Sequence, residues 1–432
     1  MYDVIVIGSG ISGLHCAYEL RKQTTNICVL EKEKRIGGRI ETKHLDGNVH
    51  VEAGARIFHH KQFYLNRLLI ELGLARQKCR VSNKYLFVPQ KKTYINKRYI
   101  VNPYNVLKII VQKAFQLPKD EQDQITLYDL ATTMFNTETI KCLLDSIGDY
   151  EPFMNMNANN AAKHYGHELH DKNRFYTLEK GMFQIIERLQ EEICDIPVYV
   201  GQEVENIRYI SSTHPYSLKD HFEIYVKGEK GPYRAQICIC AIPKIRLETI
   251  PYFNLIKDWM NCVGNQSMIS IYAMYNKRNV WFRYMSNMRT NNELRSITPI
   301  EPEKGIIQLG QADGEYVKYW KELCESYPRL RCEISKKIKE TFGLDTNEPK
   351  WFRMFLWEHR AAYWIPGCNS EIIGNYMLNP YGRDIPLYIC GDNFSQKQGW
   401  IEGALNTSHK VVKLIRHKMK TMEIGAASPP QL

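Results

Sequence analysis

The sequence lacks any apolar stretch of the roughly 18 residues that a membrane-spanning helix needs, so we expect no transmembrane segment. We also expect no secretory leader, because strand-like residues begin at position 3. Its 12 cysteines include no Cys-x-x-Cys pair of the metal-binding kind. Cys28, Cys238, Cys240 and Cys390 fall in apolar runs, where a free thiol behaves as a small hydrophobic group. These absences predict a cytoplasmic protein in a reducing compartment, without disulfides and without a metal site.

Positive charge is in excess but is not concentrated. The net charge is +11 and the pI is near 8.9, yet the basic residues are scattered along the chain. Their densest cluster, between Lys410 and Lys420, lies near the end of the last predicted helix, where cations complement the helix dipole. We therefore expect no nucleic-acid partner. A length of 432 residues predicts two or three domains.

A glycine-rich loop lies near the start of the chain. Residues 4–7 (Val-Ile-Val-Ile) predict a buried strand, and residues 8–13 are Gly-Ser-Gly-Ile-Ser-Gly, followed by apolar residues at helical spacing. In such a loop Gly8 allows a tight turn, Gly10 lets the backbone approach a pyrophosphate, and Gly13 lets the helix pack close to the strand. The diphosphate would lie at the helix N-terminus, where free N–H groups point at it.

The residues after this loop distinguish between dinucleotides. A second predicted strand, residues 27–30, ends at Glu31, 18 residues after Gly13, where a carboxylate can accept hydrogen bonds from ribose hydroxyls. Residues 37–39 (Gly-Gly-Arg) and 54–56 (Gly-Ala-Arg) follow. An NAD-binding domain has no need of a second glycine pair just past the ribose acid. The combination therefore favours a different dinucleotide.

This segment resembles the flavin-containing amine oxidase superfamily, which includes monoamine and polyamine oxidases, protoporphyrinogen oxidase and phytoene-type desaturases. Later segments match the same pattern: a Gly-Met helix start at residues 181–182, a strand beginning at Val204, and a strand ending in Ala-Ile-Pro at residues 241–243. Residues 387–392 and 399–404 resemble the family's C-terminal flavin motif. The resemblance implies FAD as the cofactor.

The resemblance also implies which residues contact FAD and how the domains are arranged. The cofactor-binding residues are expected to be Gly8, Gly10, Ile11, Ser12, Gly13, Glu31, Lys32, Gly38, Arg39, Gly54, Ala55, Arg56, Ile57, Val204, Gly391, Asp392, Gly399, Trp400, Ile401 and Ala404. The predicted fold class is α/β, with a Rossmann-like FAD-binding domain and a discontinuous α+β substrate domain. The FAD-binding domain would comprise residues 1–74, 175–247 and 371–420, the substrate domain residues 75–174 and 248–370, and a flexible tail residues 421–432.

Aromatic residues near the C-terminal motif are candidates for the catalytic site. Trp400 fills the position where amine oxidases carry an aromatic that holds the substrate nitrogen against the flavin, although a plain core role is the alternative. The family's second aromatic and its flavin-linked cysteine align with Arg360 and His359, so we expect FAD to be bound without a covalent bond. His359 is expected to be a hydrogen-bonded polar residue, and Tyr363 or Trp364 could supply the missing aromatic wall.

One departure from the family leaves the reaction open. Many members place a lysine in the strand that matches residues 267–272, where Ser270 or Ile269 stands here, and Lys277 lies past its end. We expect an amine oxidase that transfers hydride from a C–H next to nitrogen to flavin, with O₂ as acceptor and a homodimer as a possible assembly. A desaturase or porphyrinogen-type oxidase of an apolar substrate, or a non-redox flavoprotein, remains the alternative.

Overall fold

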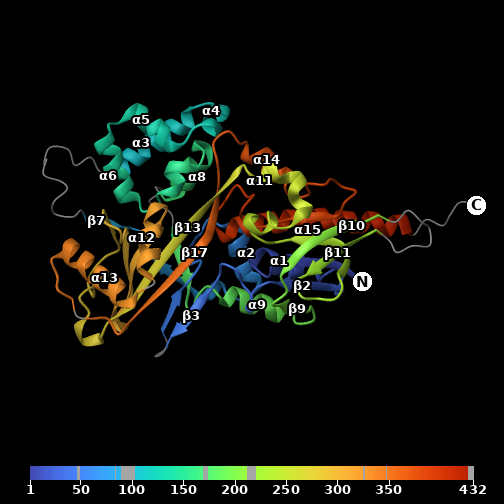
Figure 1. The fold of residues 1–432 in the computed structure, drawn as a ribbon, viewed down its shortest axis with the longest axis horizontal. Coiled ribbons are helices and arrows are strands. Elements are labelled where there is room, and N and C mark those ends of the chain that lie inside the picture. Colours follow the sequence, from blue (N-terminus) through green and yellow to red (C-terminus); the bar gives the residue numbers. More distant parts are fainter. Residues whose placement is uncertain are drawn as a thin grey trace, which may run out of the picture.

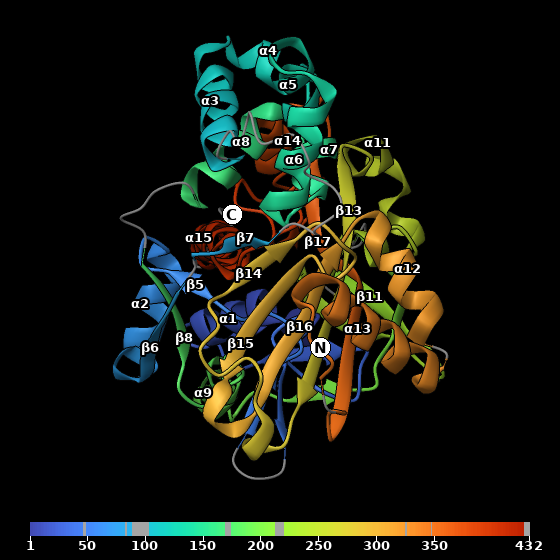
Figure 2. The ribbon, with the colours of Figure 1, turned by 90° about the vertical axis from the view of Figure 1, so that its left-hand side faces the viewer.

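The computed structural model describes residues 1–45, 49–82, 84–88, 103–168, 174–211, 220–324, 326–346 and 348–426. Two large sheets and one group of helices make up most of it (Figures 1 and 2). The predicted fold class, α/β with a Rossmann-like dinucleotide-binding part, is confirmed. The exact division into domains stays a prediction.

The first sheet has seven strands in the order β10-β11-β12-β1-β2-β9, with β18 also paired to β12. Its strands are β1 (Tyr2–Ile7), β2 (Ile27–Glu31), β9 (Val198–Val200), β10 (Val204–Ile210), β11 (His221–Val226), β12 (Tyr233–Cys240) and β18 (Leu387–Ile389). Strand β1 runs parallel to both neighbours, so the carboxyl ends of β1, β2, β12 and β18 lie at one edge. Parallel sheets bind ligands at this edge.

Helices cover this sheet on one face. They are α1 (Ile11–Leu20), α2 (Phe63–Glu71), α9 (Gln184–Glu192) and α15 (Ile401–Ala426). Their apolar residues form one core with alternate residues of β1 and β2, including Val4 and Val6, while Ile5 and Ile7 face a second core on the other side. Because both faces are buried, β1 is a continuous apolar run rather than an alternating one.

The second sheet has six strands in the order β17-β13-β16-β15-β14-β7. They are β7 (Leu86–Val88), β13 (Val263–Met274), β14 (Met288–Thr290), β15 (Ser296–Glu301), β16 (Ile306–Asp313) and β17 (Trp351–Trp364). The two long strands β13 and β17 run side by side and reach toward the first sheet (Figure 1). Helices α12 (Glu315–Cys324) and α13 (Tyr327–Phe342) pack on this sheet through an apolar core.

Six helices form a separate group at one end of the molecule (Figure 2). They are α3 (Pro103–Gln116), α4 (Lys119–Gln124), α5 (Leu127–Met134), α6 (Thr137–Ile147), α7 (Glu151–Asn155) and α8 (Ala158–Glu168). The start of α5 carries a capping box, in which the Thr126 hydroxyl accepts from the Asp129 N–H and the Asp129 carboxylate accepts from the Thr126 N–H.

Smaller elements connect these parts. The short strands are β3 (Thr42–Leu45), β4 (Val49–Glu52), β5 (Phe58–His59), β6 (Lys78–Val81) and β8 (Phe175–Leu178). The short helices are α10 (Lys244–Leu247), α11 (Lys257–Met260), α14 (Ser370–Tyr376), η1 (Ala75–Gln77), η2 (Pro251–Ile256), η3 (Lys277–Asn279) and η4 (Pro302–Lys304). Residues 93–95 (Thr-Tyr-Ile), whose composition predicts a strand, lie outside the described residues. Helix α15 continues to Ala426, so the expected tail at 421–432 begins inside a helix.

No helix in the described ranges is both long and apolar enough to span a membrane.

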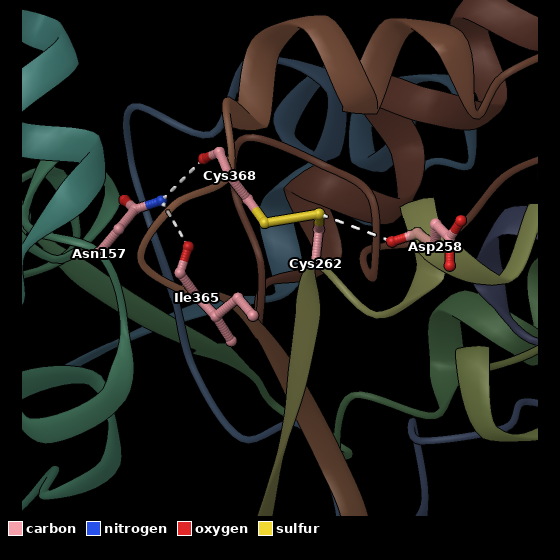
Figure 3. The surroundings of a disulfide bond; sticks show 5 residues. All are labelled: Asn157, Asp258, Cys262, Ile365 and Cys368. Carbon is pink, nitrogen blue, oxygen red and sulfur yellow. Dashed lines mark hydrogen bonds between the residues drawn. A yellow bond between two sulfur atoms is a disulfide. The ribbon is translucent and has the colours of Figure 1, made fainter.

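Cys262 and Cys368 form a disulfide, with their Cα atoms 5.7 Å apart (Figure 3). It joins the residue before β13 to the loop before α14, and Asn157 donates to the carbonyl oxygens of Cys368 and Ile365. The expectation of free thiols is therefore wrong for this pair, because a contact across 106 residues leaves no spacing signal in the sequence. The four cysteines expected in core strands are free and buried: Cys28, Cys238, Cys240 and Cys390.

A buried histidine joins α1 to α15. His15 is 8% exposed, and its Nδ1 lies 2.9 Å from the Ser408 hydroxyl. Burial lowers the pKa of His15 to about 4. The folded protein therefore keeps the ring neutral at pH values where the unfolded chain, with a pKa of about 6.5, already binds a proton. Its contribution to stability is complete above that unfolded pKa and decreases as the pH falls toward the folded pKa.

We expect this histidine to steepen acid unfolding. Between about pH 6.5 and pH 4, the free energy of unfolding of the wild type should fall by roughly 3 kcal/mol more than that of His15→Gln. Urea unfolding at several pH values measures both slopes. His417→Gln, at an exposed position on α15, is the control and should keep the wild-type slope. Equal slopes for wild type and His15→Gln would show that His15 does not contribute.

Candidate active site

The glycine loop after β1 is packed as tightly as the sequence predicts. Gly8 has a φ of +101°, and a Cβ there would lie 2.6 Å from the Ala241 carbonyl oxygen. A Cβ on Gly13 would lie 2.0 Å from the Gly8 carbonyl oxygen. Helix α1 can therefore pack this close to the loop only because residue 13 has no side chain. A Cβ on Gly10, in contrast, would meet nothing within 4 Å. The loop therefore has an open side at Gly10.

The N-terminus of α1 is suited to an anion. Its N-cap residue is Gly10, no side chain caps it, and its first turn carries no acidic residue. The free N–H groups and the helix dipole therefore have no negative partner within the helix. Ile11 and Ser12 belong to this first turn. Gly391 lies close to it, because a Cβ added to Gly391 would be 4.0 Å from the Ser12 hydroxyl. The C-terminal motif thus lies against the same helix end.

Glu31 ends β2 beside this loop and is 8% exposed. One carboxylate oxygen accepts hydrogen bonds from the Ser9 N–H (2.8 Å) and hydroxyl (2.6 Å), and the other accepts from the Glu33 N–H. Lys32 pairs with Glu203 at 3.5 Å, directly before Val204 at the start of β10. The predicted ribose and adenine contacts thus lie on one side of the loop.

The second glycine segment packs on the first. The Gly37 N–H donates to the Ser9 carbonyl (2.9 Å), and a Cβ on Gly38 would lie 3.2 Å from the Cα of Gly10. A Cβ on Gly54 would lie 2.0 Å from the carbonyl oxygen of Arg39. The segment with Ala55, Arg56 and Ile57 is therefore held against residues 37–39, and Ala55 N–H bonds the same carbonyl at 3.0 Å.

Asp392 joins three distant segments. Its carboxylate is nearly buried and pairs with the Arg39 guanidinium through both oxygens. The Gly399 N–H donates to it at 3.1 Å, and Arg39 also donates to the Arg360 carbonyl on β17 at 2.7 Å. The cofactor loop, the long strand β17 and the turn before α15 are therefore fixed together. On α15, Ile401 and Ala404 are buried in the adjacent core.

These features fit a dinucleotide with a charged diphosphate. The open side of Gly10 allows a ligand to come close to the backbone of the loop. No side chain caps the N-terminus of α1, so its N–H groups can bind a diphosphate. Glu31 lies at the end of β2, where a carboxylate can bind a ribose hydroxyl. The described residues contain no group of three His, Cys, Asp or Glu side chains that could hold a metal ion.

A cavity of about 70 Å³ lies beside Trp400. The Trp400 ring is 5.5 Å from the His59 ring, in an edge-to-face arrangement. Gln62 also lines the cavity; it is 1% exposed, and neither its amide nitrogen nor its amide oxygen has a hydrogen-bond partner among the described residues. Buried amides in proteins are almost always hydrogen-bonded, to protein or to water, so the Gln62 amide is available here to a water molecule or a polar ligand. The other lining residues are Lys61, Met156, Asn160, Lys163, His164, Gln396, Lys397, Gln398 and Glu402.

The other predicted aromatic and histidine candidates do not line this cavity. Trp364 is fully buried, donates to the Ser395 carbonyl at 2.9 Å and packs against Phe394, so it is a core residue. Tyr363 covers Gly264 and packs against the helical core of α3–α8. The Nδ1 atom of His359 is buried and has no hydrogen-bond partner among the described residues, and the expected hydrogen-bonded role of this side chain stays a prediction.

Several residues at the cavity are not among those predicted from the sequence. His59 and Gln62 follow the Gly-Ala-Arg segment closely, and this proximity was an available signal. Asn160 and His164 come from α8, whose sequence carries no motif, and only the folded chain brings them to Trp400. At the family's lysine position, Ser270 is 5% exposed and lies between β16 and β17, while Ile269 belongs to a hydrophobic core.

Comparison with known proteins agrees with this geometry. The family described as NAD(P)-binding Rossmann-like domain matches residues 6–72. The chain is 24% identical to bovine amine oxidase [flavin-containing] A over 99% of its own length and 88% of that protein. Among solved structures, a double mutant of putrescine oxidase superposes with a TM-score of 0.75 at 19% identity, covering 96% of this chain and 99% of the other.

A putative protoporphyrinogen oxidase from Exiguobacterium sp. 255-15 has a TM-score of 0.70 at 14% identity, covering 97% of this chain and 99% of the other. At these identities the solved structures show the shared fold alone. Together with the sequence match along nearly the whole chain, the comparisons support the resemblance to the flavin-containing amine oxidase superfamily.

Proposed function

We propose that this protein is an FAD-dependent amine oxidase that acts on a small-molecule amine with O₂ as the electron acceptor. The observation that carries the proposal is the convergence at the α1 N-terminus. There the glycine loop, Glu31 and the Arg39–Asp392 pair form a dinucleotide cradle, and the turn after Asp392 leads directly to Trp400 and its cavity. Bound FAD supplies a two-electron acceptor for hydride from the C–H next to the substrate nitrogen, and its reoxidation by O₂ yields H₂O₂.

The protein's own part is binding and orientation. Gly8, Gly10 and Gly13 shape the phosphate loop, and the uncapped α1 N-terminus stabilises the diphosphate charge. Trp400 and His59 form an aromatic wall that orients the substrate. No general acid or base is required of these residues for removal of a hydride. Peroxide release across a panel of mono-, di- and polyamines and amino acids tests the proposal.

A second function is favoured by one observation. Ser270 stands where many family members have a lysine, and the described part of β13 carries no lysine at all. A desaturase or porphyrinogen-type oxidase of an apolar substrate would fit this departure. Absence of peroxide with every amine tested, combined with slow reoxidation of the reduced protein by O₂, would favour this alternative. Cytoplasmic location and homodimer formation stay predictions from the sequence.

We also propose that FAD is held without a covalent bond. Neither His359 nor Arg360 is a cysteine, and the nearest cysteine along the chain, Cys368, is joined to Cys262. Acid precipitation of the yellow protein should leave its colour in the supernatant. Colour retained in the pellet would show a covalent link.

Trp400→Ala is expected to lower kcat/KM by about tenfold or more while leaving flavin content largely intact. An aromatic wall of this kind contributes about 1–3 kcal/mol, and an indole face attracts a positive or electron-poor amine carbon by about 0.5–2 kcal/mol. Trp400→Phe should retain much of the activity because it keeps a ring. Steady-state kinetics and the flavin absorbance of the purified variants measure both effects. Loss of folding or of flavin in Trp400→Ala would show that the residue supports packing instead.

A further inference from the structure

One side-chain amide in the cavity beside Trp400 lacks the partners that its neighbours have. The amides of Asn160 and Gln396 also line this cavity, and both donate to Ser370, at 3.0 Å and 2.6 Å. The Gln62 amide is buried, yet neither of its polar atoms is bonded among the described residues. A buried donor without an acceptor is costly, and an acceptor in the cavity removes that cost, whether it is water or a ligand.

Gln62 also marks the start of a helix that points its positive end at the cavity. It is the N-cap residue of α2, its side chain does not cap the helix, and the first turn contains no acidic residue. The Glu402 carboxylate accepts one of the free N–H groups, that of Leu65, at 3.1 Å. The remaining helix dipole favours negative charge at this end.

Lysines dominate the charge of the cavity wall. They come from three segments: Lys61 precedes α2, Lys163 lies on α8, and Lys397 lies in the turn before α15. The carboxylate in this wall, Glu402, is 1% exposed and pairs with Lys397 at 3.2 Å. Within the described residues, Lys61 and Lys163 form no ion pair. Two positive charges at the cavity are therefore not matched by a carboxylate.

The acids nearest to Lys163 are already engaged elsewhere. Asp123 accepts from the Asn159 amide at 2.8 Å, and Glu371 pairs with Lys119 at 2.6 Å. Partial burial and the charge of Lys119 lower the pKa of Lys163 by more than these two acids raise it. An anion placed beside this ammonium group would stabilise its charged form. The Lys163 side chain also reaches solvent, so a ligand can approach it.

We propose that the cavity beside Trp400 is an anion-binding site, in which Lys61, Lys163 and the Gln62 amide contact the ligand. A cavity of about 70 Å³ has room for a small anion or for one charged group of a larger ligand, since one water needs roughly 10–15 Å³. The anion has two possible sources, a free ion such as phosphate or an anionic group on the amine substrate. Only the second source rests on the proposed function.

Titration of the flavin-loaded protein with inorganic phosphate tests the site without turnover. Calorimetry at an ionic strength fixed with sodium chloride keeps general screening constant. We expect one phosphate per chain. Lys61→Gln and Lys163→Gln should each raise its dissociation constant by about threefold, the range for partly exposed charges, and the double variant by about tenfold.

Lys318→Gln, exposed on α12, is the matched control for these variants and should bind phosphate as the wild type does. Absence of phosphate binding to the wild type would overturn the inference. Equal dissociation constants for the wild type and the double variant would show adventitious binding elsewhere on the surface and would also overturn it.

Gln62→Leu tests the buried amide separately from the lysines. Because the amide has no partner among the described residues, an apolar side chain of similar size should not lower the temperature of thermal unfolding. The dissociation constant of phosphate should nevertheless rise by about threefold or more, because the cavity loses its unpaired donor. Unchanged phosphate affinity in a folded Gln62→Leu variant would contradict the assignment of this amide.

Turnover distinguishes the two sources of the anion. Butylamine, 4-aminobutanoate and putrescine share a four-carbon chain and end in a methyl group, a carboxylate and an ammonium group. If the substrate supplies the anion, kcat/KM should be about tenfold or more higher for 4-aminobutanoate than for putrescine, and the double variant Lys61→Glu, Lys163→Glu should reverse this order.

The outcomes separate the site from the proposed function. Phosphate binding that depends on the lysines, with the same order of the three amines in wild type and double variant, would show that the site holds a free anion. Phosphate binding without peroxide from any amine tested would contradict the proposed function and support the anion site. Phosphate binding and an order of amines that are both unaffected by the Lys61→Glu, Lys163→Glu variant would overturn the inference and leave the proposed function intact.

Discussion

Gly13→Val should yield protein without flavin and with little native structure. A Cβ at this position would lie 2.0 Å from the Gly8 carbonyl oxygen, which is too close for any real contact, and a tight 3.2 Å from the Ala241 Cβ. Both neighbours belong to the edge where β1 and β12 end, so helix α1 would have to move away from the sheet and from α15. Such overpacking costs about 1–3 kcal/mol or more, and here the displaced backbone is also the phosphate loop. Flavin absorbance and thermal unfolding measure the two losses.

Gly10→Ala is the matched control because it adds a methyl group three residues away in the same loop. Its Cβ would meet no protein atom within 4 Å, so the variant without cofactor should unfold at the wild-type temperature. Its affinity for FAD should nevertheless fall, because the methyl group projects into the space expected for the pyrophosphate. Normal flavin content in Gly13→Val, or a loss of stability in cofactor-free Gly10→Ala, would contradict this account of the loop.

Asp392→Ala should have the second largest effect, on both stability and flavin content. The variant removes the acceptor of two Arg39 hydrogen bonds and of the Gly399 N–H. Breaking a fully buried ion pair costs about 3–5 kcal/mol. Because the Arg39 side chain is 29% exposed, we expect a smaller loss of roughly 2–3 kcal/mol in the free energy of unfolding. Denaturant unfolding measures this change.

The flavin content of Asp392→Ala should fall further than its stability alone implies, because Asp392 orients the turn before α15 against residues 37–39. Asp384→Ala removes a carboxylate from the loop before β18, away from the Arg39 pair, and is the control that should keep its flavin. If Asp392→Ala purified with full flavin and wild-type stability, the Arg39–Asp392 pair would have no structural role.

The N-terminal dinucleotide-binding segment could be predicted from the sequence because its signals are local. Residues 4–7 are apolar and β-branched, residues 8–13 supply glycines where the backbone must turn and approach, and Glu31 follows at a set distance. Each of these depends on the conformational freedom of one residue or on the spacing of one strand and one helix. The structure places all three at one sheet edge as expected.

The residues around the cavity beside Trp400 could not be predicted from the sequence, because the tertiary structure decides their positions. Trp364 and Tyr363 have the right chemistry for an aromatic wall, but their places on β17 direct them into cores, because neighbouring residues of a strand face opposite sides and each side here is packed. The Cys262–Cys368 disulfide and the cavity that Asn160 and Trp400 share join residues from separate segments, and no spacing along the chain encodes such contacts. Local backbone requirements therefore made the cofactor loop predictable from the sequence, whereas long-range packing decided which side chains line the cavity beside Trp400.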